Sequence, residues 1–183
     1  MNRSPCPGPC PGHERWRPPE PRRPEPGRWP ELEAALAVVN RDLAATLPGQ
    51  DPLILLEVPA GDEDSPGGTG GERVHVAMPD GRWHGNPVHP SDLDDDPPEL
   101  DDPATALAVV ADAAQETLTE LLWRAWPVCG EHGFGMHLRP AGSAGDRYRG
   151  AAGPPVWWCR DGGHHDVSPV GELAAALQGG RRS

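Results

Sequence analysis

The sequence predicts an α+β fold. Apolar residues recur at spacings of three and four, the period of an amphipathic helix, over residues 30–47 and 104–125. Four short runs have the composition or the alternation of strands: 53–58, 73–78, 135–138 and 155–158. We therefore expect an N-terminal helix with a small antiparallel sheet, followed by a long second helix that leads into a strand-containing C-terminal unit.

The chain begins with a proline-rich segment. Of its 183 residues, 25 are Pro and 23 are Gly, and proline at the density found in residues 1–29 opposes both helix and central strand. We predict a disordered tail there. Cys6, Cys10 and His13 lie in this tail, where no neighbouring element would hold them rigidly, so we interpret them as free side chains rather than as metal ligands.

Residues 30–90 are predicted to form the first helix and its strands. Pro30 suits the first helical turn, and Pro48 with Gly49 should end the helix. Its apolar stripe consists of Leu32, Leu36, Val39, Leu43 and Leu47. The polar residues 40–42 are expected to face solvent.

The strands at 53–58 and 73–78 pair most simply as an antiparallel hairpin with a long loop, and a third strand is expected to begin at 82–85. Three histidines lie in or near this region: His75, His84 and His89. Their separations of nine and five residues match no familiar pattern of metal ligands. We interpret them as surface or strand-facing residues.

An acidic linker is predicted at 91–103, before the long helix. It lacks the residue order and the central glycine of a calcium-binding EF-hand loop, so we interpret it as a solvated spacer. Asp101 or Asp102 could cap the helix that follows, and Pro127 prevents its continuation. The helix and the unit after it occupy residues 104–178, and this part could pack with residues 30–90 as one domain.

The net charge of −12 argues against nucleic acid as a partner, because phosphate binding needs a concentrated basic face. Residues 91–122 contain ten acidic residues and no basic one, whereas residues 123–183 carry a net charge of +2. The sequence also lacks an apolar run of about 18 residues that could span a membrane, and its N-terminus lacks the apolar core of a signal peptide. We expect a cytoplasmic protein with no membrane contact.

Two short clusters of Cys and His stand near the C-terminal end. Cys129 and His132 are separated by two residues, and Cys159 is followed by His164 and His165. Zn²⁺ binds thiolate sulfur and imidazole nitrogen, usually with four ligands in structural sites. In a reducing cytoplasm, paired Cys and His are expected to hold metal rather than to form disulfides. We therefore predict a zinc site, against the alternative of buried cysteines and surface histidines without metal.

Strand alternation helps to choose the fourth ligand. In an extended chain His165 shares a face with Val167, which should point inward, so we favour His165 and keep His164 as the alternative. Two Cys/His turns, each beside a strand, are the layout of a zinc ribbon. Because four ligands close the coordination sphere, we expect a structural rather than a catalytic ion.

The segment from Trp126 to Leu173 resembles a family of small uncharacterised actinobacterial proteins, typified by W-P-x-C-x-x-H, then W-x-C, a histidine, and a closing I/V-G-E-L. Here these motifs read W-P-V-C-G-E-H, W-W-C-R-D-G-G-H-H and V-G-E-L. The resemblance covers about the last third of the chain. It implies Cys129, His132, Cys159 and His165 as the motif positions, and it implies no particular activity.

Together these observations predict a small binding or adaptor protein with a structural zinc site and a protein partner, and no enzyme. Two alternatives remain open. A zinc-dependent hydrolase would use an open metal position with Asp166 or Glu131 as the base, although the sequence has no H-E-x-x-H motif. A nucleic-acid-binding zinc ribbon is the other alternative, because the C-terminal segment alone is mildly basic.

Overall fold

The computed structural model describes residues 20–59, 72–88, 102–140 and 153–179. Its elements, in chain order, are α1 (Pro30–Thr46), β1 (Ile54–Pro59), β2 (Glu72–Ala77), α2 (Pro103–Leu122), β3 (His137–Pro140), β4 (Pro155–Cys159), β5 (His165–Pro169) and α3 (Leu173–Gly179). The predicted α+β class is confirmed.

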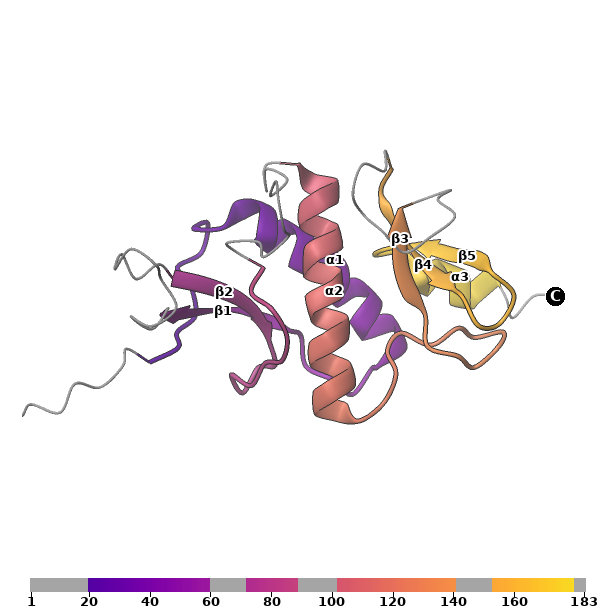
Figure 1. The fold of residues 1–183 in the computed structure, drawn as a ribbon, viewed down its shortest axis with the longest axis horizontal. Coiled ribbons are helices and arrows are strands. Elements are labelled where there is room, and N and C mark those ends of the chain that lie inside the picture. Colours follow the sequence, from indigo (N-terminus) through magenta and orange to yellow (C-terminus); the bar gives the residue numbers. More distant parts are fainter. Residues whose placement is uncertain (1–19, 60–71, 89–101, 141–152, 180–183) are drawn as a thin grey trace, which may run out of the picture.

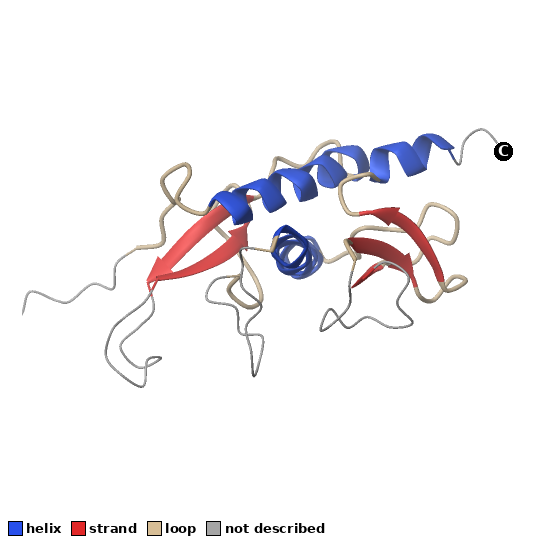
Figure 2. Cartoon of the chain, turned by 90° about the horizontal axis from the view of Figure 1, so that it is seen from above, coloured by secondary structure: helices blue, strands red, loops and turns tan. Residues whose placement is uncertain are grey.

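The helices separate two small antiparallel sheets (Figure 1). One sheet pairs β1 with β2, and the other has the order β3-β4-β5. Seen from above, α2 is viewed end-on between the two sheets, while α1 crosses over it and α3 continues beyond α1 on the same side (Figure 2). The C-terminal sheet brings the end of β4 beside the start of β5, with Cys159 opposite His165.

Local chemistry explains where both long helices begin and where α2 ends. The Glu33 carboxylate accepts hydrogen bonds from the backbone N–H groups of Gly27 and Trp29, ahead of α1. Asp102 is the N-cap of α2 and accepts from the Thr105 N–H at 2.9 Å, one of the two caps expected from the sequence. The helix stops three residues before the predicted end at 125, because Trp123 takes the left-handed conformation, with φ 54° and ψ 39°.

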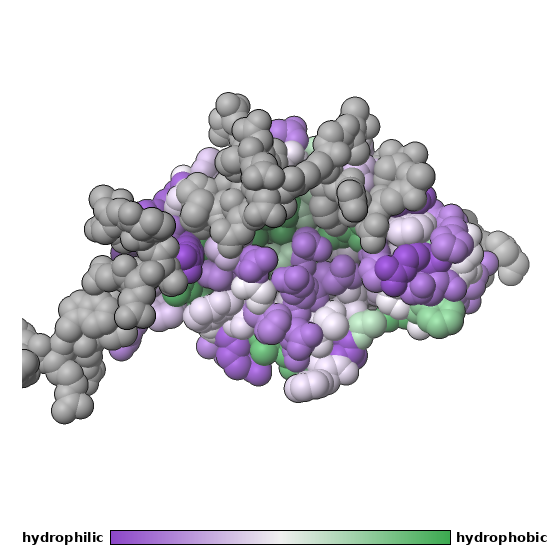
Figure 3. Space-filling model, in the orientation of Figure 1, coloured by the Kyte–Doolittle hydropathy of each residue, from purple (hydrophilic) through white to green (hydrophobic). Residues whose placement is uncertain are grey.

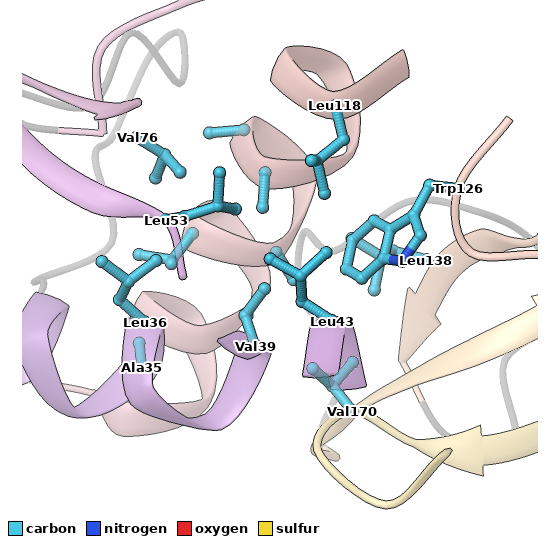
Figure 4. Packing of buried hydrophobic residues seen from close by; sticks show 14 of the residues in the cluster. Ala35, Leu36, Val39, Leu43, Leu53, Val76, Leu118, Trp126, Leu138 and Val170 are labelled. Atoms are coloured by element: carbon cyan, nitrogen blue, oxygen red, sulfur yellow. The ribbon is translucent and has the colours of Figure 1, made fainter. Parts of the chain in front are cut away.

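One hydrophobic core joins the two halves of the described chain (Figure 4). Leu43 of α1 points toward Trp126, and Leu138 and Val170 of the C-terminal unit lie beside them. Other members come from both helices and from the first sheet: Leu32, Leu36, Val39, Leu53, Val74, Val76, Val110 and Leu118. The segments 30–90 and 104–178 therefore share a core over the residues that the structure describes.

Residues 20–29, which the sequence assigns to the disordered tail, instead have a defined position against the first sheet. The backbone of Arg22 forms an antiparallel bridge with Glu57 of β1. The Glu57 carboxylate is buried and pairs with Arg22 at 3.0 Å and with Arg28 at 2.6 Å. Both arginines also pair with Glu72. A buried carboxylate requires such partners. The density of proline, on which the prediction of a disordered tail rested, does not reveal them. Residues 1–19 lie outside the described part.

Three further expectations concern a strand at 82–85, the acidic linker and a helix that could span a membrane. The expected strand at 82–85 is reduced to a single bridge between Ala77 and Trp83. Most of the predicted acidic linker, residues 91–101, lies outside the described residues, and Asp102 and Pro103 belong to the start of α2. Within the described ranges, no helix has both the length and the apolar composition needed to cross a bilayer.

The expectation that residue 42 faces solvent is wrong. The side chain of Asp42 on α1 is 0% exposed. Its carboxylate accepts hydrogen bonds from Trp157 Nε1 at 2.7 Å and from the backbone N–H groups of Gly171 at 2.6 Å and Leu173 at 2.8 Å. This charged group attaches the C-terminal sheet and α3 to α1, and so fixes the position of the Cys/His clusters relative to the helices.

Candidate metal centre

The first Cys/His loop, residues 128–135, is a tight turn held at both ends. Gln115 Nε2 on α2 donates hydrogen bonds to the carbonyl oxygens of Trp126 at 2.9 Å and Met136 at 2.6 Å, one on each side of the loop. Inside it, Cys129 N donates to Phe134 O, and Gly133 N donates to Cys129 O, both at 2.8 Å. Gly133 has φ +72°, which a glycine adopts without strain.

The second Cys/His loop, residues 159–165, connects the end of β4 to the start of β5. It passes close to the first loop at Gly162. A Cβ atom at this position would overlap the His132 side chain and would lie 2.7 Å from Cys159 Sγ. The absence of a side chain at residue 162 therefore allows the two loops to meet.

The loops bring two thiols and one imidazole to a common point. His132 Nδ1 lies 3.6 Å from Cys129 Sγ and 3.7 Å from Cys159 Sγ, and all three atoms are within 4.8 Å of one another. In a tetrahedral zinc site, bond lengths of about 2.3 Å to sulfur and about 2.0 Å to nitrogen place the two ligand atoms roughly 3.5 Å apart. The predicted residues Cys129, His132 and Cys159 are thus spaced as ligands of one metal ion would be.

His165 belongs to a neighbouring group rather than to the thiol cluster itself. Glu131, His132 and His165 also have ligand atoms within 4.8 Å of one another, and the two imidazole rings are 5.3 Å apart. His164 is in neither group. It has φ +53°, and its ring lies 6.0 Å from that of Trp158. Ligation by His165 stays a prediction, and His165, unlike His164, belongs to a group that includes His132.

The two cysteines are buried and differ in acidity. Burial is the largest single influence on the pKa of the Cys129 thiol and raises it. Hydrogen bonds from the His132 ring and from the backbone N–H groups of His132 and Glu131 outweigh burial, so this pKa is held below its ordinary value. Burial and the neighbouring Cys129 sulfur raise the pKa of Cys159, against a hydrogen bond from the Gly162 N–H. A divalent cation between the sulfurs would favour the thiolate form of both.

The structure separates the remaining candidates from this centre. Asp166, considered as a catalytic base, is paired with Arg139 Nε at 2.7 Å. His75 is buried beside Trp83, and the His84 backbone bonds to Thr117. Neither histidine belongs to a potential metal-holding group among the described residues. His89, Cys6, Cys10 and His13 lie outside those residues.

Sequence reasoning missed two features of the centre. In the sequence, Gly162 is one of many glycines. The structure shows that a side chain is excluded there because the His132 side chain lies against it. Glu131 was considered only as a base in a catalytic site, whereas its carboxylate lies 3.8 Å from the Nε2 atoms of both His132 and His165. Its position inside C-G-E-H-G, next to a predicted ligand, was the available signal.

Comparison of this chain with models of protein families, with curated proteins and with solved structures finds no match. The resemblance to the actinobacterial family therefore stays a prediction, and the argument for function depends on the geometry of the centre.

Proposed function

We propose that the C-terminal unit is a zinc-ribbon-like module in which Cys129, His132, Cys159 and His165 hold one structural Zn²⁺. The observation that carries this proposal is the position of His132 Nδ1, 3.6 Å and 3.7 Å from two buried sulfur atoms that come from separate loops. Thiolate and imidazole are the ligands that zinc prefers in structural sites.

A structural role is supported by what surrounds the thiols. Backbone N–H groups of the turns donate to both sulfurs, Glu131 and His132 to Cys129 and Gly162 to Cys159. Such donors stabilise thiolate charge. The loops themselves contribute few large apolar side chains to the core, so metal binding would supply much of the free energy that holds them in place.

We further propose that this module serves a cytoplasmic binding or adaptor protein whose partner is a protein. The first Cys/His loop exposes two apolar side chains, Val128 at 43% and Phe134 at 49%, and Trp123 at the end of α2 is 89% exposed. Figure 3 shows green surface at the lower right, over the connection from α2 to β3, beside the mainly purple surface of α2. Exposed aromatic side chains are enriched at protein interfaces.

The test is the metal content of the purified full-length protein and of cysteine variants. The wild type should contain one zinc per chain, and Cys129→Ser and Cys159→Ser should each reduce the content to near zero. Cys6→Ser and Cys10→Ser are matched controls, because they remove a thiol from the predicted tail, and they should keep the full content. A wild type that folds without metal would refute the proposal.

A zinc-dependent hydrolase is the second candidate, and one observation favours it. Among the residues that the structure describes, three ligand atoms converge at the thiols, while His165 lies in the adjoining group with Glu131. A water molecule could then occupy the fourth position, with Glu131 as base. If so, His165→Ala would keep its zinc with high affinity, and ester hydrolysis would be lost in Glu131→Gln. A closed structural site predicts weaker zinc binding in His165→Ala and no hydrolysis in the wild type.

A further inference from the structure

The carboxylate of Glu131 lies beside the Nε2 atoms of both imidazole rings of the candidate centre. Its Oε1 is 3.8 Å from His132 Nε2, and its Oε2 is 3.8 Å from His165 Nε2. Each oxygen thus faces one ring nitrogen. Both distances are longer than a hydrogen bond, and the Glu131 side chain, which is 73% exposed, has room to rotate toward these nitrogens.

The opposite nitrogens of both rings are directed elsewhere. His132 Nδ1 faces Cys129 Sγ and Cys159 Sγ. A Cβ atom built on Gly163 would lie 3.5 Å from both His132 Cε1 and His165 Nδ1 and 3.7 Å from His132 Nε2, so both rings border the same glycine in the second Cys/His loop. The Nε2 atoms of the rings share Glu131, and their Nδ1 atoms remain for other partners.

The different partners of the Nε2 and Nδ1 atoms matter for metal binding. A histidine that ligates through Nδ1 must carry its proton on Nε2, and a carboxylate that accepts that proton in a hydrogen bond fixes the tautomer and the ring orientation. Here one carboxylate is placed to do this for two rings that belong to different loops.

We propose that Glu131 is a shared positioning residue, outside the coordination sphere, that holds His132 and His165 in the tautomer that ligates through Nδ1. This inference rests on the proposed zinc site. It assigns Glu131 neither as a metal ligand nor as a catalytic base, and it explains how His165, which lies in the outer group, is directed toward the ion.

The experiment compares zinc affinity, measured by competition with a chromophoric chelator, in the full-length wild type, Glu131→Ala and Glu131→Gln. Glu131→Ala should weaken zinc binding about 10- to 100-fold, the usual range for loss of such a partner. Glu131→Gln keeps one carbonyl acceptor and should fall between wild type and Glu131→Ala. Glu172→Gln is the matched control, because Glu172 is an exposed carboxylate of the same C-terminal unit and belongs to neither potential metal-holding group, and this variant should bind zinc like the wild type.

Two spectroscopic readouts separate positioning from ligation. The absorption spectrum of the Co²⁺-substituted protein should keep the same coordination in Glu131→Ala as in the wild type. In ¹⁵N NMR spectra of the zinc-loaded wild type, both rings should carry their proton on Nε2, and these protons should exchange faster with water in Glu131→Ala.

Three results would overturn the inference while leaving the zinc site intact: unchanged affinity in Glu131→Ala, a changed Co²⁺ coordination in that variant, or an Nδ1-protonated ring in the wild type. A wild type that binds no zinc would instead refute the proposed function, and this inference with it.

Discussion

Trp157 Nε1 donates a hydrogen bond of 2.7 Å to Asp42 Oδ2, joining residues 115 positions apart in the sequence. Trp157 lies two residues before Cys159, and the same carboxylate also binds the backbone at Gly171 and Leu173. The ring of Trp157 meets that of Trp126, which precedes the first Cys/His loop, in an edge-on contact at 5.4 Å. Together these contacts connect α1 to β4 and to the two Cys/His loops that carry the candidate ligands.

Replacing Asp42 by Ala should destabilise the protein by about 3–5 kcal/mol, because two buried donors and one part-buried donor lose their acceptor. Asn keeps one acceptor oxygen, so Asp42→Asn should cost less, about 1–2 kcal/mol. The free energy of unfolding, measured by urea titration, checks both values. Asp51→Ala removes an exposed carboxylate just beyond α1 and should have almost no effect. If Asp42→Ala and Asp51→Ala changed the free energy of unfolding equally, Asp42 would not be the buried acceptor described here.

The stability of the protein should also depend on pH through Asp42. Burial is the largest influence on the pKa of this carboxyl and raises it above the ordinary value of 3.8, while hydrogen bonds from Trp157, Gly171 and Leu173 offset only part of the rise. The folded state thus binds the proton more tightly than the unfolded state. The resulting stability is fully present below the unfolded pKa of about 4 and is lost as the pH rises through the folded pKa.

The stability difference between wild type and Asp42→Asn isolates this contribution from those of the other carboxylates. It should be larger at pH 3.5 than at neutral pH, by roughly 1.4 kcal/mol for each unit by which the pKa is raised. Urea unfolding of both proteins across this range gives the difference directly. A difference that grows with rising pH would show that the fold favours the ionised carboxylate instead.

Much of the fold follows from local patterns. The spacing of apolar residues predicted the two long helices as 30–47 and 104–125, and the structure has Pro30–Thr46 and Pro103–Leu122. Periodicity does not register the left-handed conformation of Trp123, so the second helix was predicted three residues too long. Alternation predicted the first hairpin, in which Ile54 stands opposite Ala77.

Features that depend on distant partners could not be read from local patterns. Asp42 lies in a polar run on an amphipathic helix, and only the return of the chain at Trp157 and Gly171 buries it. Arg22 and Arg28 appear as part of a proline-rich tail until Glu57 is found buried beneath them. For the candidate site, the C-x2-H spacing predicted Cys129 and His132 as ligands. The choice between His164 and His165 depends on the conformation of the second loop, which the sequence does not show.

Gly162 should be the glycine of the site least tolerant of a side chain. Gly162→Ala places a methyl group against the His132 ring, and relieving such an overlap costs about 1–3 kcal/mol, which corresponds to roughly 5- to 150-fold in zinc affinity. Gly130→Ala is the matched control in the first loop. Its new methyl group would meet only Leu177, at an ordinary 3.6 Å, so zinc affinity should stay unchanged. A normal affinity in Gly162→Ala would mean that the two loops are not in contact as described.

The two adjacent histidines should respond differently to replacement. His165→Ala is expected to lower zinc affinity by at least about tenfold, since it removes a proposed ligand. His164→Ala should leave the affinity close to that of the wild type, because the His164 ring contacts Trp158 instead. Chelator competition measures both. The reverse order of effects would assign the fourth position to His164.

The coordination of the ion shows whether Cys129 and Cys159 hold zinc. X-ray absorption at the zinc edge of the purified full-length protein should give two sulfur neighbours at about 2.3 Å and two nitrogen neighbours at about 2.0 Å. A folded protein that contains no zinc would contradict the proposed site. So would an ion surrounded only by nitrogen and oxygen, because Cys129 and Cys159 would then have no part in holding it.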